Sequence, residues 1–166
     1  MNPFIQLDRY AYEEPHYLQL RFRISNGHQY GDAEIYANAE DVKDWGAALV
    51  DFPQHKAHVY LWEAGSEYQE DRYAHYMRLR CFVRDSVGHS AIQVRYSNNG
   101  EPPHKELFEF TIPVDAAALN RLGSALLRFA ALEHEALFWT PEDVTLFKTR
   151  KEAEPSRAAN LAPLGG

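Results

Sequence analysis

The sequence predicts a single α+β domain, in which a largely antiparallel, twisted sheet of six or seven strands carries two helices on its apolar face. Apolar and polar residues alternate through most of the first two thirds of the chain, whereas two segments repeat apolar residues every three to four positions. The chain has 166 residues, of which 45% are hydrophobic and 25% charged. It is therefore long enough to build one core of its own.

The strand pattern is clearest around Leu18 and Leu20, which alternate with polar neighbours. A period of two is satisfied by a strand and not by a helix. Asn26 and Gly27 then supply a turn, and residues 30–37 read as the antiparallel partner strand. Further strands are expected over residues 4–8, 57–63, 76–84, 91–96 and 107–112.

Two segments are predicted as amphipathic helices. The first follows Asn38, a preferred N-cap residue, and stops at Pro53, whereas the second follows Asp115. Their apolar residues line up at a constant offset, with Gly46 and Gly123 at equivalent places. We interpret this as a degenerate internal repeat of strand, turn, strand and helix, the alternative being a chance match between amphipathic helices. The glycines are expected to bring each helix close to a sheet.

The folded domain is predicted to span residues 1–139. A short helix is expected over 140–152, because a proline occupies its start, and a flexible tail over 153–166, where Ala, Pro, Ser and Gly dominate. The chain has neither an apolar run long enough to cross a bilayer nor a secretory leader pattern. Together with the single cysteine, Cys81, this indicates a cytoplasmic protein.

Acidic residues outnumber basic ones by 24 to 17, giving a net charge of −7. An acidic body repels nucleic acid phosphates and anionic membrane surfaces, and it attracts a basic protein. We therefore expect a protein partner of basic character, no nucleic acid and no membrane, with a homodimer also allowed. The alternative is that the charge serves solubility alone.

The sequence contains no glycine-rich phosphate motif, and we expect neither a cofactor nor a metal. Asp85, His89 and Ser90 have the ingredients of nucleophilic catalysis. Catalytic triads, however, assemble from separate elements, and this segment is typical of a hairpin turn. A small hydrolase-like or metal-binding enzyme with its site near Asp85 and His89 is the alternative function.

The polar face of the predicted sheet is rich in arginine and aromatic residues, which are enriched at protein interfaces. The alternative is a solvated face of cross-strand Arg–Glu pairs, or a face buried in a self-associating scaffold. The candidate binding residues are Arg21, Arg23, Tyr36, Trp62, Arg78, Arg80 and Arg95.

Several motifs resemble a family of small uncharacterised bacterial proteins over roughly residues 17–130. They are Glu34-Ile35-Tyr36-Ala37, Val42, Trp45-Gly46, Leu49, Phe52-Pro53, Asp85, Gly88-His89-Ser90-Ala91 and Val94. Some relatives lie among bacterial toxin and immunity genes, so the resemblance implies an immunity-type inhibitor of a cognate toxin, and it assigns no catalytic residue. The predicted function is a non-enzymatic protein-binding module.

Overall fold

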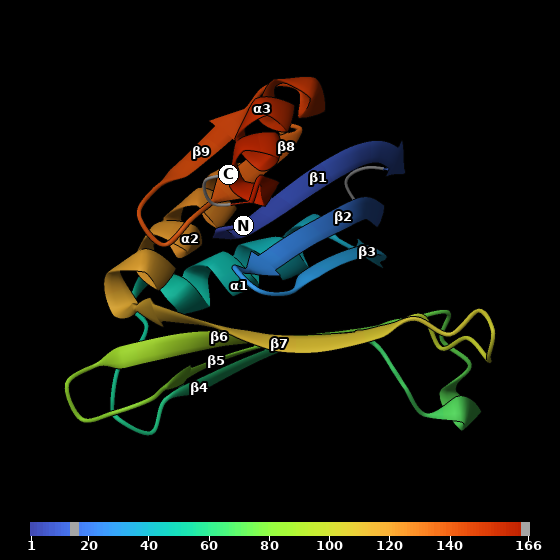
Figure 1. Cartoon of the computed structure of the whole chain (residues 1–166), viewed down its shortest axis with the longest axis horizontal. Helices are drawn as coiled ribbons and strands as arrows, with labels where there is room; N and C mark the ends of the chain where they lie inside the picture. The colour runs from blue at the N-terminus through green and yellow to red at the C-terminus, as the bar shows by residue number, and fades with distance from the viewer. Residues whose placement is uncertain (14–16, 164–166) are drawn as a thin grey trace.

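The computed structural model describes residues 1–13 and 17–163, and it confirms the α+β class. The strands form two antiparallel sheets instead of one (Figure 1). Sheet A has the order β3-β2-β1-β8-β9, and sheet B has the order β4-β5-β6-β7. The elements are β1 Pro3–Glu13, β2 Tyr17–Asn26, β3 Tyr30–Ala37, α1 Ala39–Val50, β4 Val59–Gly65, the 3-10 helix η1 Gln69–Asp71, β5 Tyr76–Val83, β6 His89–Ser97, β7 Leu107–Asp115, α2 Ala116–Phe129, β8 Ala136–Trp139, β9 Val144–Phe147 and α3 Arg150–Leu161.

Helices α1 and α2 lie between the two sheets, and α3 lies on the opposite side of sheet A (Figure 1). The inner faces of both sheets and the apolar sides of α1 and α2 share one core. Three aromatic rings join these layers at its centre. The ring centroid of Trp45 lies 5.5 Å from that of Trp62 and 6.1 Å from that of Phe22. Burial in this core raises the pKa of the Cys81 thiol to about 12, as fits a small apolar residue.

The two central helices cross at their glycines. A Cβ atom on Gly46 would lie 2.9 Å from the carbonyl oxygen of Gly123, and one on Gly123 would lie 2.8 Å from the carbonyl oxygen of Gly46. The close approach predicted from the sequence therefore exists, but each helix approaches the other helix and not a sheet. Only glycine lets two helix backbones meet at this separation.

The strand order reveals the internal repeat. The order β3-β2-β1-β8 in sheet A matches β7-β6-β5-β4 in sheet B, and every neighbouring pair is antiparallel. Helix α1 follows β3 as α2 follows β7. Strand β8, although it comes after α2, therefore takes the place in sheet A that β4 takes in sheet B. The repeat is confirmed, and a strand from the C-terminal part of the chain completes its first copy.

The C-terminal segment differs from the prediction. Thr140 begins the turn between β8 and β9 where a helix was expected, and helix α3 starts later, capped by Thr149. The prediction of a flexible tail over 153–166 was wrong for residues 153–161, which belong to α3, and its last three residues lie outside the described part. Composition missed this helix because packing against sheet A, where Ala153 is fully buried, orders it. None of the described helices has the length and apolarity needed to cross a bilayer.

Candidate binding surface

The side chains predicted to share one polar face are separated in the structure. The outer face of sheet A carries Arg21, Arg23 and Tyr36, the outer face of sheet B carries Arg78, Arg80 and Arg95, and Trp62 lies in the core. Trp62 is only 7% exposed, because it lies opposite the inward-facing Leu79 on the neighbouring strand. Its assignment to the polar face was wrong, since alternation alone does not say which of two phases points inward.

The charges on the outer face of sheet A are paired within that face. Arg21 donates two hydrogen bonds to the carboxylate of Asp32, at 2.9 and 2.7 Å. Arg23 is buried, and its guanidinium lies 3.7 Å from the carboxylate of Asp8. Burial raises the pKa of that Asp8 carboxyl group. Helix α3 contacts β1, β8 and β9 of this sheet, so much of this face is already covered.

A row of paired charges crosses the outer face of sheet B. Arg78 on β5 lies directly opposite Arg95 on β6, an arrangement that is destabilising because the two charges are alike. Glu109 on β7 offsets it by accepting a hydrogen bond of 2.9 Å from Arg78 and one of 3.2 Å from Arg95. Glu67 accepts two more from Arg95, at 2.8 and 3.1 Å. These four groups therefore bind one another.

The adjacent rows, toward the β5–β6 hairpin, hold an arginine without an anionic partner. Arg80 lies opposite Leu61 and Gln93, and its guanidinium lies 4.6 Å from the ring centroid of Phe82. Over the described ranges, Arg80 forms no ion pair. Val59 and Leu61, each 48% exposed, lie on the same face beside it. An unpaired cation thus lies among exposed apolar side chains.

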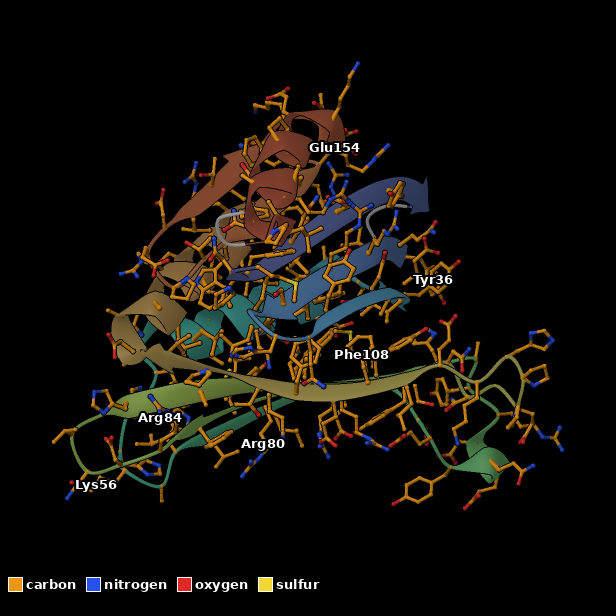
Figure 2. All side chains as sticks on the ribbon, viewed as in Figure 1. Tyr36, Lys56, Arg80, Arg84, Phe108 and Glu154 are labelled. Atoms are coloured by element: carbon orange, nitrogen blue, oxygen red, sulfur yellow. The ribbon has the colours of Figure 1, made fainter. Side chains whose placement is uncertain are left out.

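Two further cations lie at this end of sheet B. Arg84 continues the outward alternation of β5 and donates to the carbonyl oxygen of Ser90 at 2.7 Å. Lys56 is exposed in the loop before β4. In the part of the chain that the structure describes, neither forms an ion pair. Figure 2 shows Arg80 below the ribbon of sheet B, with Arg84 and Lys56 toward the end of the sheet that holds the β5–β6 hairpin. We define the cationic-apolar patch as Lys56, Val59, Leu61, Arg80, Phe82 and Arg84.

The alternative site at Asp85, His89 and Ser90 forms the turn of the β5–β6 hairpin. One carboxylate oxygen of Asp85 accepts hydrogen bonds from the backbone nitrogens of Val87 and His89, at 3.0 and 3.1 Å. The other contacts the His89 imidazole, which lowers the pKa of Asp85. Ser90 is buried, and its hydroxyl donates to the carbonyl oxygen of Gly88 at 3.2 Å. Across residues 1–13 and 17–163, no three His, Cys, Asp or Glu side chains form a metal-binding group.

Comparison with known proteins gives two distant structural similarities. No family model matches the chain, and no curated protein matches it. The structure of the plant transcriptional regulator PBF-2 is similar with a TM-score of 0.45 and 9% identity, over 78% of this chain and 76% of that one. The crystal structure of WHY1 from Arabidopsis thaliana is similar with a TM-score of 0.45 and 11% identity, over 78% of this chain and 84% of that one.

The expectations about partners drawn from net charge are corrected. The expectation that excluded nucleic acid was wrong to rest on the net charge alone. The physical reason is that a net charge of −7 says nothing about where the cations lie. Arg80 and Arg84 have no ion-pair partner among the described residues, so the local charge at this end of sheet B differs in sign from the net charge of the chain.

Proposed function

We propose that this protein is a non-enzymatic binding module that docks an acidic protein partner on the outer face of sheet B. The observation that carries the proposal is the cationic-apolar patch. There Arg80 and Arg84 have no anionic partner among the described residues, while Val59 and Leu61 are each 48% exposed. An apolar centre flanked by arginine is the composition typical of protein interfaces.

The composition of this face favours a protein over a nucleic acid. The ring of Phe82 is covered by the Arg80 guanidinium, which competes with a nucleobase for stacking on that side. The exposed aliphatic side chains of Val59 and Leu61 gain from burial against a protein surface.

In its most specific form the proposal is the immunity-type inhibitor that the family resemblance implies. The partner is then a bacterial toxin, and the patch covers an acidic surface that the toxin needs for its activity. A toxin variant with those acidic groups neutralised is expected to escape inhibition, as seen in a growth assay with co-expressed protein. A toxin that escapes without losing affinity for the protein would contradict this form of the proposal.

The test compares two anionic probes, poly-L-glutamate and a single-stranded oligothymidylate, by fluorescence anisotropy at low and high salt. The double variant Arg80→Glu/Arg84→Glu is expected to weaken poly-L-glutamate binding at least about tenfold at low salt, since it reverses both unpaired arginine charges of the patch. Lys151→Glu on α3 is the control for a charge reversal, because Lys151 is exposed and distant from sheet B in the fold.

Three outcomes would contradict the proposal. Poly-L-glutamate binding that is absent, or that falls equally in the control, would remove the patch as the site. Tighter binding of the oligothymidylate would assign the face to nucleic acid. Sedimentation that shows a dimer disrupted by the patch substitutions would assign it to self-association.

A further inference from the structure

The two equivalent sheets differ in what covers their outer faces. In sheet A, helix α3 lies over β1 and β8, on the side away from α1 and α2 (Figure 1). In sheet B, β5 and β4 occupy the corresponding positions. No described α-helix covers their outer face (Figure 1), although the loop after β4 reaches the end of the sheet away from the β5–β6 hairpin, where Glu67 binds Arg95. The repeat therefore contains two equivalent locations. The one on sheet A is covered by α3, and the one on sheet B has no helix over it.

The contacts of α3 show how a helix fills this location. The outward-facing rings of Phe4 and Phe138 stack with their centroids 5.2 Å apart, and both side chains are at least 95% buried. Ala153 of α3 is fully buried and lies outside the main core, on the same side of sheet A. Arg150 lies 4.1 Å from the ring centroid of Tyr10. A small apolar contact and a stacked arginine thus contribute to the docking of this helix of 12 residues, together with hydrogen bonds from the Asn2 backbone nitrogen to the Asn160 carbonyl oxygen and from Arg150 to the Arg9 carbonyl oxygen.

The bare location on sheet B carries the cationic-apolar patch. Leu61 on β4 and Arg80 on β5 are directly opposite one another, and Val59 and Phe82 form the next row. Leu61 and Val59 offer apolar surface where sheet A offers Phe4 and Phe138. The cations beside them, Arg80 among them, have no anionic partner within the described chain.

We infer that the partner contributes an amphipathic helix, with acidic residues beside its apolar stripe, that lies across β4 and β5 as α3 lies across β8 and β1. This inference rests on the proposed function and names the element of the partner that binds. A helix of about 12 residues is roughly 18 Å long, which fits on the seven- and eight-residue strands β4 and β5. Carboxylates at one edge of its apolar stripe would face Arg80 and Arg84.

Helix α3 of a second copy does not fit as the occupant. Its buried Ala153 already packs on sheet A of its own chain, and its capping residue Thr149 is separated from the end of β9 in that sheet by Lys148 alone. Because α3 is already held on sheet A of its own chain, a helix from a different protein is the better occupant of this face.

The experiment uses two labelled 16-residue peptides of equal charge. The first has leucines every three to four positions, which form one helical stripe, and glutamates beside that stripe. In the second, two central uncharged residues are replaced by proline, which breaks the helix. Binding to the full chain is followed by fluorescence anisotropy, and helix formation by circular dichroism at 222 nm. We expect the first peptide to bind at least about tenfold more tightly and to gain helical signal on binding. Leu61→Glu should weaken it about tenfold, while the control Leu127→Glu, on the exposed side of α2, should not.

The outcomes separate this inference from the proposed function. Equal binding of both peptides, with loss in Leu61→Glu, would overturn the helix and leave an acidic protein partner bound as an extended chain. Failure of both peptides to bind, or equal losses in Leu61→Glu and Leu127→Glu, would overturn the inference and the proposed function together. Thermal unfolding of each variant checks that the loss does not come from unfolding.

Discussion

Replacing Gly123 by alanine tests the crossing of α1 and α2 on which both sheets are mounted. The added Cβ would lie 2.6 Å from the backbone nitrogen of Val50 and 2.8 Å from the carbonyl oxygen of Gly46. Ordinary van der Waals contact begins near 3.4 Å, so the helices must separate by roughly 0.8 Å. Because the obstructing atoms belong to the backbone, no side-chain rotation relieves the contact.

The magnitude follows from two opposing effects. Overpacking of a close contact costs about 3 kcal/mol at its upper end, and the helix propensity of alanine over glycine returns about 1 kcal/mol. We therefore expect Gly123→Ala to lower the free energy of unfolding by about 2 kcal/mol. Gly46→Ala should cost less, since its shortest contacts are 2.9 Å and one of the three nearest atoms belongs to a side chain.

Urea unfolding followed by tryptophan fluorescence measures this difference. With a slope of about 2 kcal/mol/M, the midpoint for Gly123→Ala should fall by about 1 M. Ser124→Ala, on the exposed side of the same helix, is the control and should leave stability unchanged or slightly raised. A Gly123→Ala protein at least as stable as the wild type would refute the backbone contact between the helices.

Four further predictions concern other parts of the fold. The Cys81 thiol, whose pKa is about 12, should react with a disulfide reagent at pH 8 orders of magnitude more slowly in the folded than in the urea-unfolded protein; equal rates would place it at the surface. Because ionisation is delayed in the folded state, Cys81 should also make stability fall as pH rises from about 9 toward 12, a loss that Cys81→Ala removes. Ala153→Glu should lower stability by about 2–3 kcal/mol in urea titrations by burying a charge under α3, yet leave peptide binding to sheet B unchanged. The pKa of Asp85 is lowered in the folded protein, so its contribution to the free energy of unfolding is present above the unfolded pKa near 3.8 and is lost as pH falls through the folded value. Asp85→Asn should remove this loss from the acid unfolding curve. An unchanged curve would contradict the turn contacts of Asp85.

Local patterns in the sequence predicted the elements that depend on neighbouring residues. Asn38 caps α1 as expected, accepting a hydrogen bond of 2.8 Å from the backbone nitrogen of Asp41. Asp85 closes its hairpin turn, and the equivalent glycines of the repeat lie at equivalent places in α1 and α2. Each of these features is set by a few consecutive residues and by backbone geometry, so one sequence suffices to predict it.

The division into two sheets depends on contacts between distant segments. Strands β2 and β5 both alternate apolar inward and polar outward, so Arg21 and Arg80 seemed to share a face, although their strands belong to different sheets. Val59 and Leu61 were missed because Trp62 was assigned outward, which places its odd-numbered neighbours inward. The alternation over residues 59–62 fits either phase, and the contacts of Trp62 with Phe22 and Trp45 on other elements decide which one points inward.

The origin of the bare face lies in the connectivity of the repeat. The fourth strand of sheet A, β8, comes from the C-terminal part of the chain, and it is followed by β9 and α3, which extend that sheet and cover its outer face. The fourth strand of sheet B, β4, is instead preceded by α1, which packs against α2. The described chain thus supplies a cover for only one of two equivalent locations. The unpaired cations lie at the other location, where a partner can neutralise them without displacing any part of this protein.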